Sequence, residues 1–177
     1  HYIDPHGPYD APSDAPADFS HDEPVPVDIK RIAEYVRDGE LDDGAEYVDR
    51  YDEEIAYTDR EVGRLLKKFE ALDLPRSPLT IITSDHGEAF YEHGRYLHGL
   101  MWNEIIRVPL LIKWPHGERT GARGAHVSSS IDLVPTILEL MKVPLPERND
   151  DPGNHDFLSG VSLLPDIFPN PGDEPAG

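Results

Sequence analysis

Cysteine is absent from this chain of 177 residues. Its absence excludes disulfide bonds, zinc sites built from thiolates and a cysteine nucleophile within these residues. Any metal ion that the chain binds must therefore be held by oxygen or imidazole ligands.

Basic residues are scarce. The chain has 16 Lys and Arg against 35 Asp and Glu, which gives a formal net charge of −19 at pH 7. Nucleic-acid binding needs clusters of Lys and Arg that neutralise phosphates, so we expect no nucleic-acid partner. No uninterrupted apolar run is long enough to cross a bilayer, so we also expect no membrane span.

The types of charged residue are unevenly represented, with 20 Asp against 15 Glu and 11 Arg against 5 Lys. This pattern resembles the halophile-like acidic surface of proteins from a high-salt cytoplasm. An acidic mesophilic surface is the alternative, because net charge affects solubility and does not determine the fold.

A long amphipathic helix is predicted after residues 42–44. Apolar or aromatic residues recur there at spacings of three and four, which is the helical period. The predicted helix has about 25 residues. Its inward positions are Val48, Tyr51, Ile55, Thr58, Val62, Leu65, Phe69 and Leu72.

Two short apolar runs follow, at residues 79–83 and 108–114, and a second amphipathic helix is predicted over residues 131–141. Runs of this kind are typical of strands buried on both faces, as in a parallel sheet. The alternation of strands and helices predicts a layered α/β fold. In such folds ligands collect beyond the carboxyl ends of the strands, so we expect the chemistry just after Thr83.

Asp85 and His86 follow the first run directly, and Gly87 lets the backbone turn. A carboxylate next to an imidazole is a ligand pair for a hard divalent cation such as calcium or manganese. The alternative is that Asp85 caps a helix and the nearby histidines are surface residues of a loop. Asp42 and Asp43 are interpreted as capping residues of the long helix and not as metal ligands.

His6 lies between two prolines in the opening loop. Restricted backbone freedom suits a histidine that meets a substrate anion or donates a proton to a leaving group. A loop histidine without a function is the alternative.

Seven blocks of the sequence, in order, resemble the C-terminal part of the sulfatase catalytic domain, which belongs to the alkaline phosphatase superfamily. The blocks are DPHGPY, YDEEIAYTDREVGRLL, TIITSDHGE, EHGRYLHG, EIIRVPLLIKWP, SSIDLVPTILEL and GVSLLP. The resemblance covers residues 1–165. Residues 166–177, rich in Pro, Asp and Gly, are expected to form a flexible tail.

The resemblance implies an α/β fold with a mixed, largely parallel sheet sandwiched by helices, present here as a partial domain. It also implies hydrolysis of a small-molecule or glycan sulfate ester with the help of a divalent metal ion. Calcium is the expected ion, with manganese and magnesium as alternatives. The family's nucleophile is a formylglycine made from Cys or Ser in a C/S-x-P-x-R motif, and a Ser or Thr nucleophile is the alternative.

Four residues receive roles from the resemblance. Asp85 and His86 are the expected metal ligands, and His6 is expected to contact the sulfate group and assist the leaving group. His98 stands where the family often has a sulfate-contacting Lys, and a histidine carries its charge only when protonated.

No C/S-x-P-x-R motif occurs in the chain. We therefore expect the nucleophile and the remaining metal ligands to precede His1, and we expect this chain alone to be inactive. Two other functions stay open. One is a phosphodiesterase or phosphonate monoester hydrolase of the same superfamily, which His98 favours, and the other is a non-catalytic, acidic, calcium-binding module.

Overall fold

The structure is a computed structural model of the 177-residue chain. It describes residues 1–16, 19–21, 23–25, 27–37, 39, 41, 43–75, 77–96, 98–115, 117, 119–124, 127–145 and 158–169. The chain divides into two compact units. The first contains residues 1–76 and 83–110, and the second contains residues 77–82 and 111–177.

The first unit is built on a long helix, α1 (Gly44–Glu70), which confirms the helix predicted from the sequence. Asp43 caps its start by accepting a hydrogen bond from the backbone N–H of Ala45. Lys67 and Lys68 lie in its last turn, where positive charge stabilises the carbonyl end of a helix. Asp43 is thus a capping residue, as expected, whereas Asp42 lies outside the described residues.

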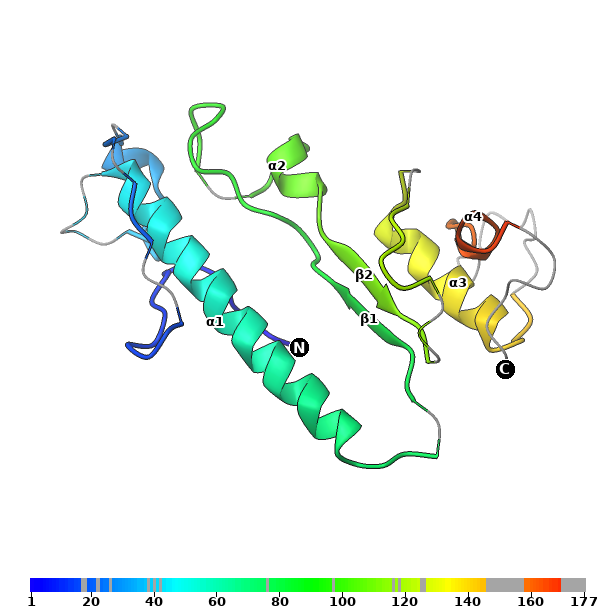
Figure 1. Ribbon diagram of the computed structural model, residues 1–177. Helices are drawn as coiled ribbons and strands as arrows, with labels where there is room; N and C mark the ends of the chain where they lie inside the picture. The colour runs from blue at the N-terminus through cyan, green and yellow to red at the C-terminus, as the bar shows by residue number, and fades with distance from the viewer. Residues whose placement is uncertain are drawn as a thin grey trace. The chain divides into compact units, whose positions relative to one another are not determined.

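An aromatic cluster joins α1 to the rest of the first unit. The ring of Tyr51 on α1 lies 5.6 Å from that of Tyr9 and 5.0 Å from that of Phe90. Figure 1 shows the opening loop running beside α1. A short 3-10 helix, η1 (Ile29–Arg31), completes this part of the unit. The C-terminal half of α1 keeps part of its apolar stripe open, since Leu65 and Phe69 are exposed.

Two short strands, β1 (Thr80–Thr83) and β2 (Leu110–Lys113), form a two-stranded sheet. The strands coincide with the predicted apolar runs, but they run antiparallel (Figure 1). The expectation that these strands are buried on both faces, as in a parallel sheet, is wrong for this pair. Side chains alternate between the two faces of a strand, and exposure alternates along β2, with Leu111 57% exposed. The wider, helix-sandwiched sheet stays a prediction.

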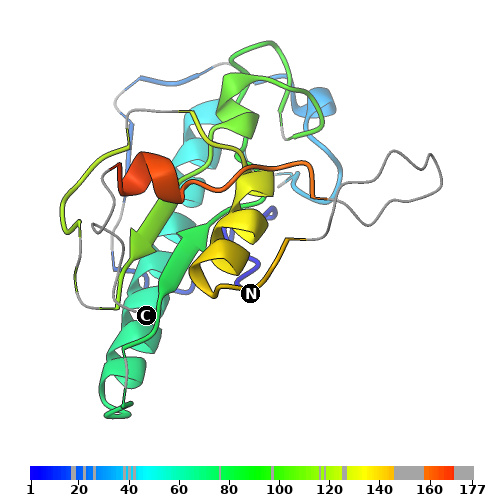
Figure 2. The ribbon, with the colours of Figure 1, turned by 90° about the vertical axis from the view of Figure 1, so that its right-hand side faces the viewer.

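The second unit covers one face of this sheet with two helices, α3 (Leu133–Leu140) and α4 (Leu164–Ile167) (Figure 2). Its core contains Trp114, Leu164 and Phe168, with Ile112 and Leu140 packed against them. The short 3-10 helix η2 (Ser130–Asp132) leads into α3, and Ser129 and Asp132 cap it reciprocally. The helix predicted over residues 131–141 is therefore confirmed.

Two single-turn helices were not predicted: α4 and α2 (Asn103–Ile106). Because α4 extends to Ile167 and Phe168 is buried, packed structure continues beyond residue 165. Residues 170–177 of the expected tail lie outside the described residues, and the division at residue 165 stays a prediction. No helix in the described part of the chain has the length and apolar character needed to span a membrane.

Candidate functional site

The Asp85–His86 turn lies directly after β1 and is held in place by α2. The backbone N–H of Gly87 donates to the carbonyl of Ile105 over 2.7 Å. A methyl group on Gly87 would lie 2.1 Å from the carbonyl oxygen of Glu104, so this close approach requires glycine. The Ser84 hydroxyl closes the turn by donating to the carbonyl of His86 over 2.7 Å.

His86 is oriented as a ligand histidine would be. Its Nδ1 lies 2.8 Å from the carbonyl oxygen of Gly87, which can only accept, so Nδ1 carries a proton and, in the neutral ring, the lone pair is on Nε2. Nε2 lies 3.9 Å from Oδ2 of Asp85. These two atoms form a nitrogen–oxygen donor pair on the exposed side of the turn.

Asp85 is suited to meet a cation. Partial burial by itself would raise the pKa of this carboxyl. The net pKa nevertheless lies below its ordinary value. It is lowered by hydrogen bonds from the backbone N–H groups of His86 and Asp85, by the nearby His86 ring and by a hydrogen bond from the Ser84 hydroxyl. Asp85 is therefore ionised at neutral pH, and its side chain is 81% exposed.

The pair fits a hard divalent cation in donor type, but two donors do not complete a coordination sphere. Within the described ranges, no group of three or more Asp, Glu or His side chains is placed to hold a metal ion. Asp85 and His86 thus supply two donors, fewer than a divalent cation needs.

His6 is held by a buried carboxylate of α1. The backbone N–H groups of His6 and Asp10 donate to the two oxygens of Glu54, over 3.1 and 2.8 Å. Burial raises the pKa of Glu54, and the neighbouring Asp4 and Asp10 raise it further, whereas these two N–H donors oppose the shift. The opening loop expected from the sequence is therefore anchored to α1 around His6.

The ring of His6 repeats the arrangement of His86. Its Nδ1 lies 2.7 Å from the carbonyl oxygen of Gly7, so Nε2 is again the atom left for a ligand. The ring stacks on that of Tyr35, with centroids 6.0 Å apart and an interplanar angle of 22°.

His98 lies between the other two histidines. Its ring centroid is 4.0 Å from that of His86 and 6.5 Å from that of His6. His6 and His98 are 92 positions apart in the sequence, yet the first unit brings their rings together. The four residues singled out from the sequence thus occupy one region of that unit.

Glu88 was quoted in the sequence blocks but given no role, and the structure places it against His98. Oε1 of Glu88 lies 3.4 Å from Nδ1 of His98, and the hydroxyl of Tyr9 donates to Oε2 over 3.1 Å. Burial, followed by the Glu88 carboxylate, raises the pKa of Tyr9, so this hydroxyl remains a donor. The Glu88 side chain is only 6% exposed, and it links the aromatic core to His98.

Comparison with known proteins adds an independent result. The family model described as Sulfatase matches residues 1–143. Human arylsulfatase K is 36% identical over 110 residues, which are 62% of this chain and 19% of the relative. The N-acetylglucosamine-6-O-sulfatase of Bacteroides thetaiotaomicron is 30% identical over 154 residues, which are 83% of this chain and 26% of the relative.

The solved structure of BT4656 in complex with its substrate D-glucosamine-2-N,6-O-disulfate is also similar. The TM-score is 0.58 at 29% sequence identity, and the match covers 69% of this chain and 23% of that one. The chain spans 19% and 26% of the two curated relatives. The family model matches most of the residues, and the structural similarity agrees with it. The chain belongs to the sulfatase family.

Proposed function

We propose that the protein is a sulfuric ester hydrolase and that this chain supplies one side of its active site. The observation that carries the proposal is the gathering of His6, His86 and His98 beside Asp85 in the first unit. Family membership supports sulfate as the group transferred, and neither phosphate esters nor a non-catalytic role is favoured by the relatives.

His6 and His98 are proposed to contact the sulfate group. Since Nδ1 of His6 donates its hydrogen bond to the Gly7 carbonyl, Nε2 is the atom available to contact a sulfuryl oxygen or to protonate the leaving oxygen. His98 has its Nδ1 beside Glu88, which likewise leaves Nε2 for the substrate. Donors fixed before the reaction stabilise charge that develops on the transferred group.

Asp85 and His86 are proposed as two ligands of a divalent cation, with calcium as the proposed ion. A bound divalent cation supplies positive charge that polarises the sulfuryl oxygens. The ionised Asp85 and the Nε2 lone pair of His86 suit this role. The proposed nucleophile, a formylglycine or a Ser or Thr, is not contributed by any C/S-x-P-x-R motif of this chain. The alkaline phosphatase-like sandwich of helices around a mixed, largely parallel sheet belongs to the same proposal.

The proposed substrate class is a sulfated saccharide or a smaller sulfate ester. Two of the similar proteins support it, because one is named as an N-acetylglucosamine-6-O-sulfatase and the other was solved with a glucosamine disulfate.

Paired aryl sulfate and aryl phosphate esters, assayed with the full-length protein, test the proposal. We expect the sulfate ester to be hydrolysed with the higher kcat/KM. We expect His6→Ala to lower kcat by about 100- to 1000-fold, the loss typical of a single transition-state donor. His21→Ala is the matched control, because His21 pairs with Asp49 away from the cluster. A preference for the phosphate ester would contradict the reaction class, and unchanged kinetics of His6→Ala would remove His6 from the site.

A further inference from the structure

Tyr35 lies on a compact turn that follows η1 in the first unit. The backbone N–H groups of Val36 and Arg37 both donate to the carbonyl of Ala33, each over 3.0 Å. Nη2 of Arg37 donates to the carbonyl of Ile32 over 2.9 Å. These bonds close the turn on itself, so the backbone of Tyr35 has little freedom to move.

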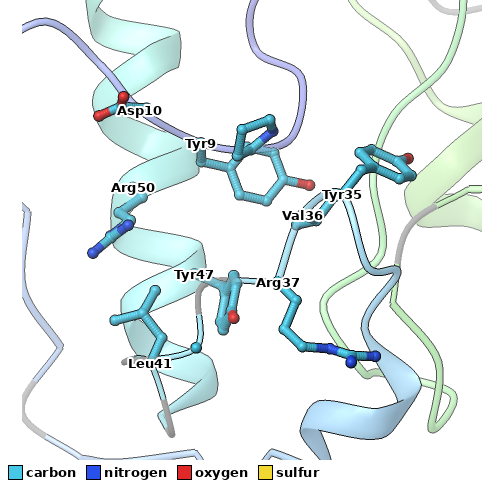
Figure 3. Close-up of a pocket in the computed structure, with 10 residues that line it drawn as sticks. Tyr9, Asp10, Tyr35, Val36, Arg37, Leu41, Tyr47 and Arg50 are labelled. Atoms are coloured by element: carbon cyan, nitrogen blue, oxygen red, sulfur yellow. The ribbon is translucent and has the colours of Figure 1, made fainter.

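Val36 fixes this turn against the loop that carries His6. Its side chain is buried and belongs to the same core cluster as Tyr9. A methyl group on Gly7 would clash with the Val36 side chain, so the backbone next to His6 lies in close contact with the turn. Figure 3 shows Val36 beside Tyr9, with Tyr35 next to it on the same segment.

The side chain of Tyr35 is directed at the ring of His6 and not into the core. The two ring centroids lie 6.0 Å apart with an interplanar angle of 22°, which is an offset stack of the kind that aromatic rings prefer. Tyr35 is 51% exposed, whereas the neighbouring Val36 is 3% exposed. The contact with His6 therefore explains the place of this ring better than core packing does.

Three contacts hold His6, and each holds a different part of it. Glu54 accepts from its backbone N–H, the Gly7 carbonyl lies beside Nδ1, and Tyr35 covers one face of the ring. The torsion that turns an imidazole ring has broad minima, so a hydrogen bond at one atom leaves the ring some freedom. A second ring stacked on its face opposes that rotation.

We propose that Tyr35 is a positioning residue for His6, because its ring holds the imidazole with Nδ1 at the Gly7 carbonyl and Nε2 free for the ester. The proposal rests on the sulfatase function proposed above. In the assisted step the S–O bond to the leaving group breaks, and the leaving oxygen keeps the electron pair and takes a proton from Nε2 of protonated His6. The deprotonated oxygen of the proposed nucleophile forms the new bond to sulfur. A ring turned out of this orientation delivers the proton poorly.

Two aryl sulfates, assayed with the full-length protein, test the role of Tyr35. The leaving oxygen of phenyl sulfate is more basic than that of para-nitrophenyl sulfate, so its departure depends more on proton donation. We expect Tyr35→Leu to lower kcat/KM for phenyl sulfate by about 100-fold, which a misplacement of about 1 Å can cost, and to lower that for para-nitrophenyl sulfate by less. Tyr35→Phe keeps the ring and should retain both values.

An equal loss with the two esters, which a general structural defect would give, would overturn the proposal. A loss confined to KM would overturn it as well, because Tyr35 would then hold the substrate and not His6. Tyr57→Leu is the matched control, since Tyr57 is a partly exposed tyrosine of the same unit whose ring lies 4.9 Å from the guanidinium of Arg60. It should leave the ratio of the two kcat/KM values unchanged, and a changed ratio would overturn the assignment to Tyr35.

Nitrogen NMR of the full-length protein, labelled at histidine, gives a readout that does not depend on activity. At a pH where the ring is neutral, we expect His6 to carry its proton on Nδ1 in the wild type and in Tyr35→Phe. Tyr35→Leu should show a mixture of the two tautomers, and an unchanged tautomer there would overturn the proposal. If Tyr35→Leu does not fold, the absence of nuclear Overhauser contacts between the two rings of the unmodified protein would overturn it.

The outcomes also separate this proposal from the proposed function. Hydrolysis of both aryl sulfates with an unchanged ratio in Tyr35→Leu would overturn the role of Tyr35 alone. A tautomer that depends on Tyr35, in a full-length protein that hydrolyses no sulfate ester, would overturn the proposed function and leave the hold of Tyr35 on the His6 ring standing.

Discussion

Two buried glutamates hold the histidines of the first unit. Glu54 accepts hydrogen bonds from the backbone N–H groups of His6 and Asp10. Glu88 lies between the Tyr9 hydroxyl and His98. Buried carboxylates are stable only when hydrogen-bonded, so each glutamate fixes the groups around it as well as itself. Both are positioning residues for the histidines beside them.

If the full-length protein hydrolyses sulfate esters as proposed, Glu88→Gln should lower its kcat by about 10- to 100-fold, the range for groups that orient functional histidines. The amide can still accept from the Tyr9 hydroxyl, but its NH2 group would then face the Nδ1–H of His98, and two donors repel. The KM for an aryl sulfate should change less than kcat, because the ring is displaced and not removed. Glu92→Gln, an exposed change in the same loop, is the control. Equal effects of the two variants would contradict the role of Glu88.

Glu54 should give the protein a characteristic pH dependence. Its pKa is raised in the folded state, so the folded protein binds this proton more tightly than the unfolded chain does. Its contribution to the free energy of unfolding should therefore fall as the pH rises above the ordinary value of 4.5. Urea unfolding of wild type and Glu54→Gln from pH 4.5 to about pH 7 measures the difference. Asp59→Asn, an exposed change on α1, is the control. A wild type that gains stability relative to Glu54→Gln as the pH rises would contradict the assignment.

The residues proposed for the chemistry were singled out from the sequence, whereas the residues that contact them were not. His6, Asp85, His86 and His98 stand in short sequence blocks, and their roles stay predictions. Glu88 is hydrogen-bonded to Tyr9, 79 residues away in the sequence, and Glu54 is hydrogen-bonded to His6, 48 residues away. No local pattern marks a contact between residues so far apart.

Element by element, periodicity and capping signals predicted α1, β1, β2 and α3, because each is long or uniform enough to show a pattern. The single-turn helices α2 and α4 have four residues each, too few for a helical period to appear. The relative direction of the two strands could not be predicted either, because the apolar runs at residues 79–83 and 108–114 are compatible with a parallel or an antiparallel pair. Pairing decides the direction, and pairing is a property of the folded chain.

The packing of α2 against the Asp85–His86 turn predicts a sharp effect at Gly87. A Cβ there would meet the Glu104 carbonyl, so Gly87→Ala should lower the free energy of unfolding by about 1–3 kcal/mol, as overpacked sites do. If Asp85 and His86 bind calcium as proposed, the substitution should also weaken that binding, because the turn must move. Gly63→Ala is the control, since a Cβ at this α1 position meets nothing within 4 Å and alanine should stabilise the helix by about 0.5–1 kcal/mol. Two variants of equal stability would contradict the close packing.

At the scale of the whole molecule, the charge of −19 should make stability depend on salt. Like charges repel in the compact state, and screening shortens their reach from about 30 Å at 0.01 M salt to about 3 Å at 1 M. We expect the midpoint of urea unfolding, monitored through the helical signal of α1, to rise across this range of salt concentration. Sodium chloride and potassium chloride should act alike if ionic strength is the cause. A midpoint that stays level or falls would count against a halophile-like surface.

The anchoring of the His6 loop on Glu54 also has a consequence for the order of folding. The hydrogen bonds within α1 join neighbours on the chain, whereas the two bonds to Glu54 close segments of 48 and 44 residues. Closing a long segment costs conformational entropy, so we expect α1 to form first and the loop to dock afterwards. We therefore expect His6 to reach its place beside Glu54 late in folding, and we expect local opening of the folded chain to release it while α1 stays intact.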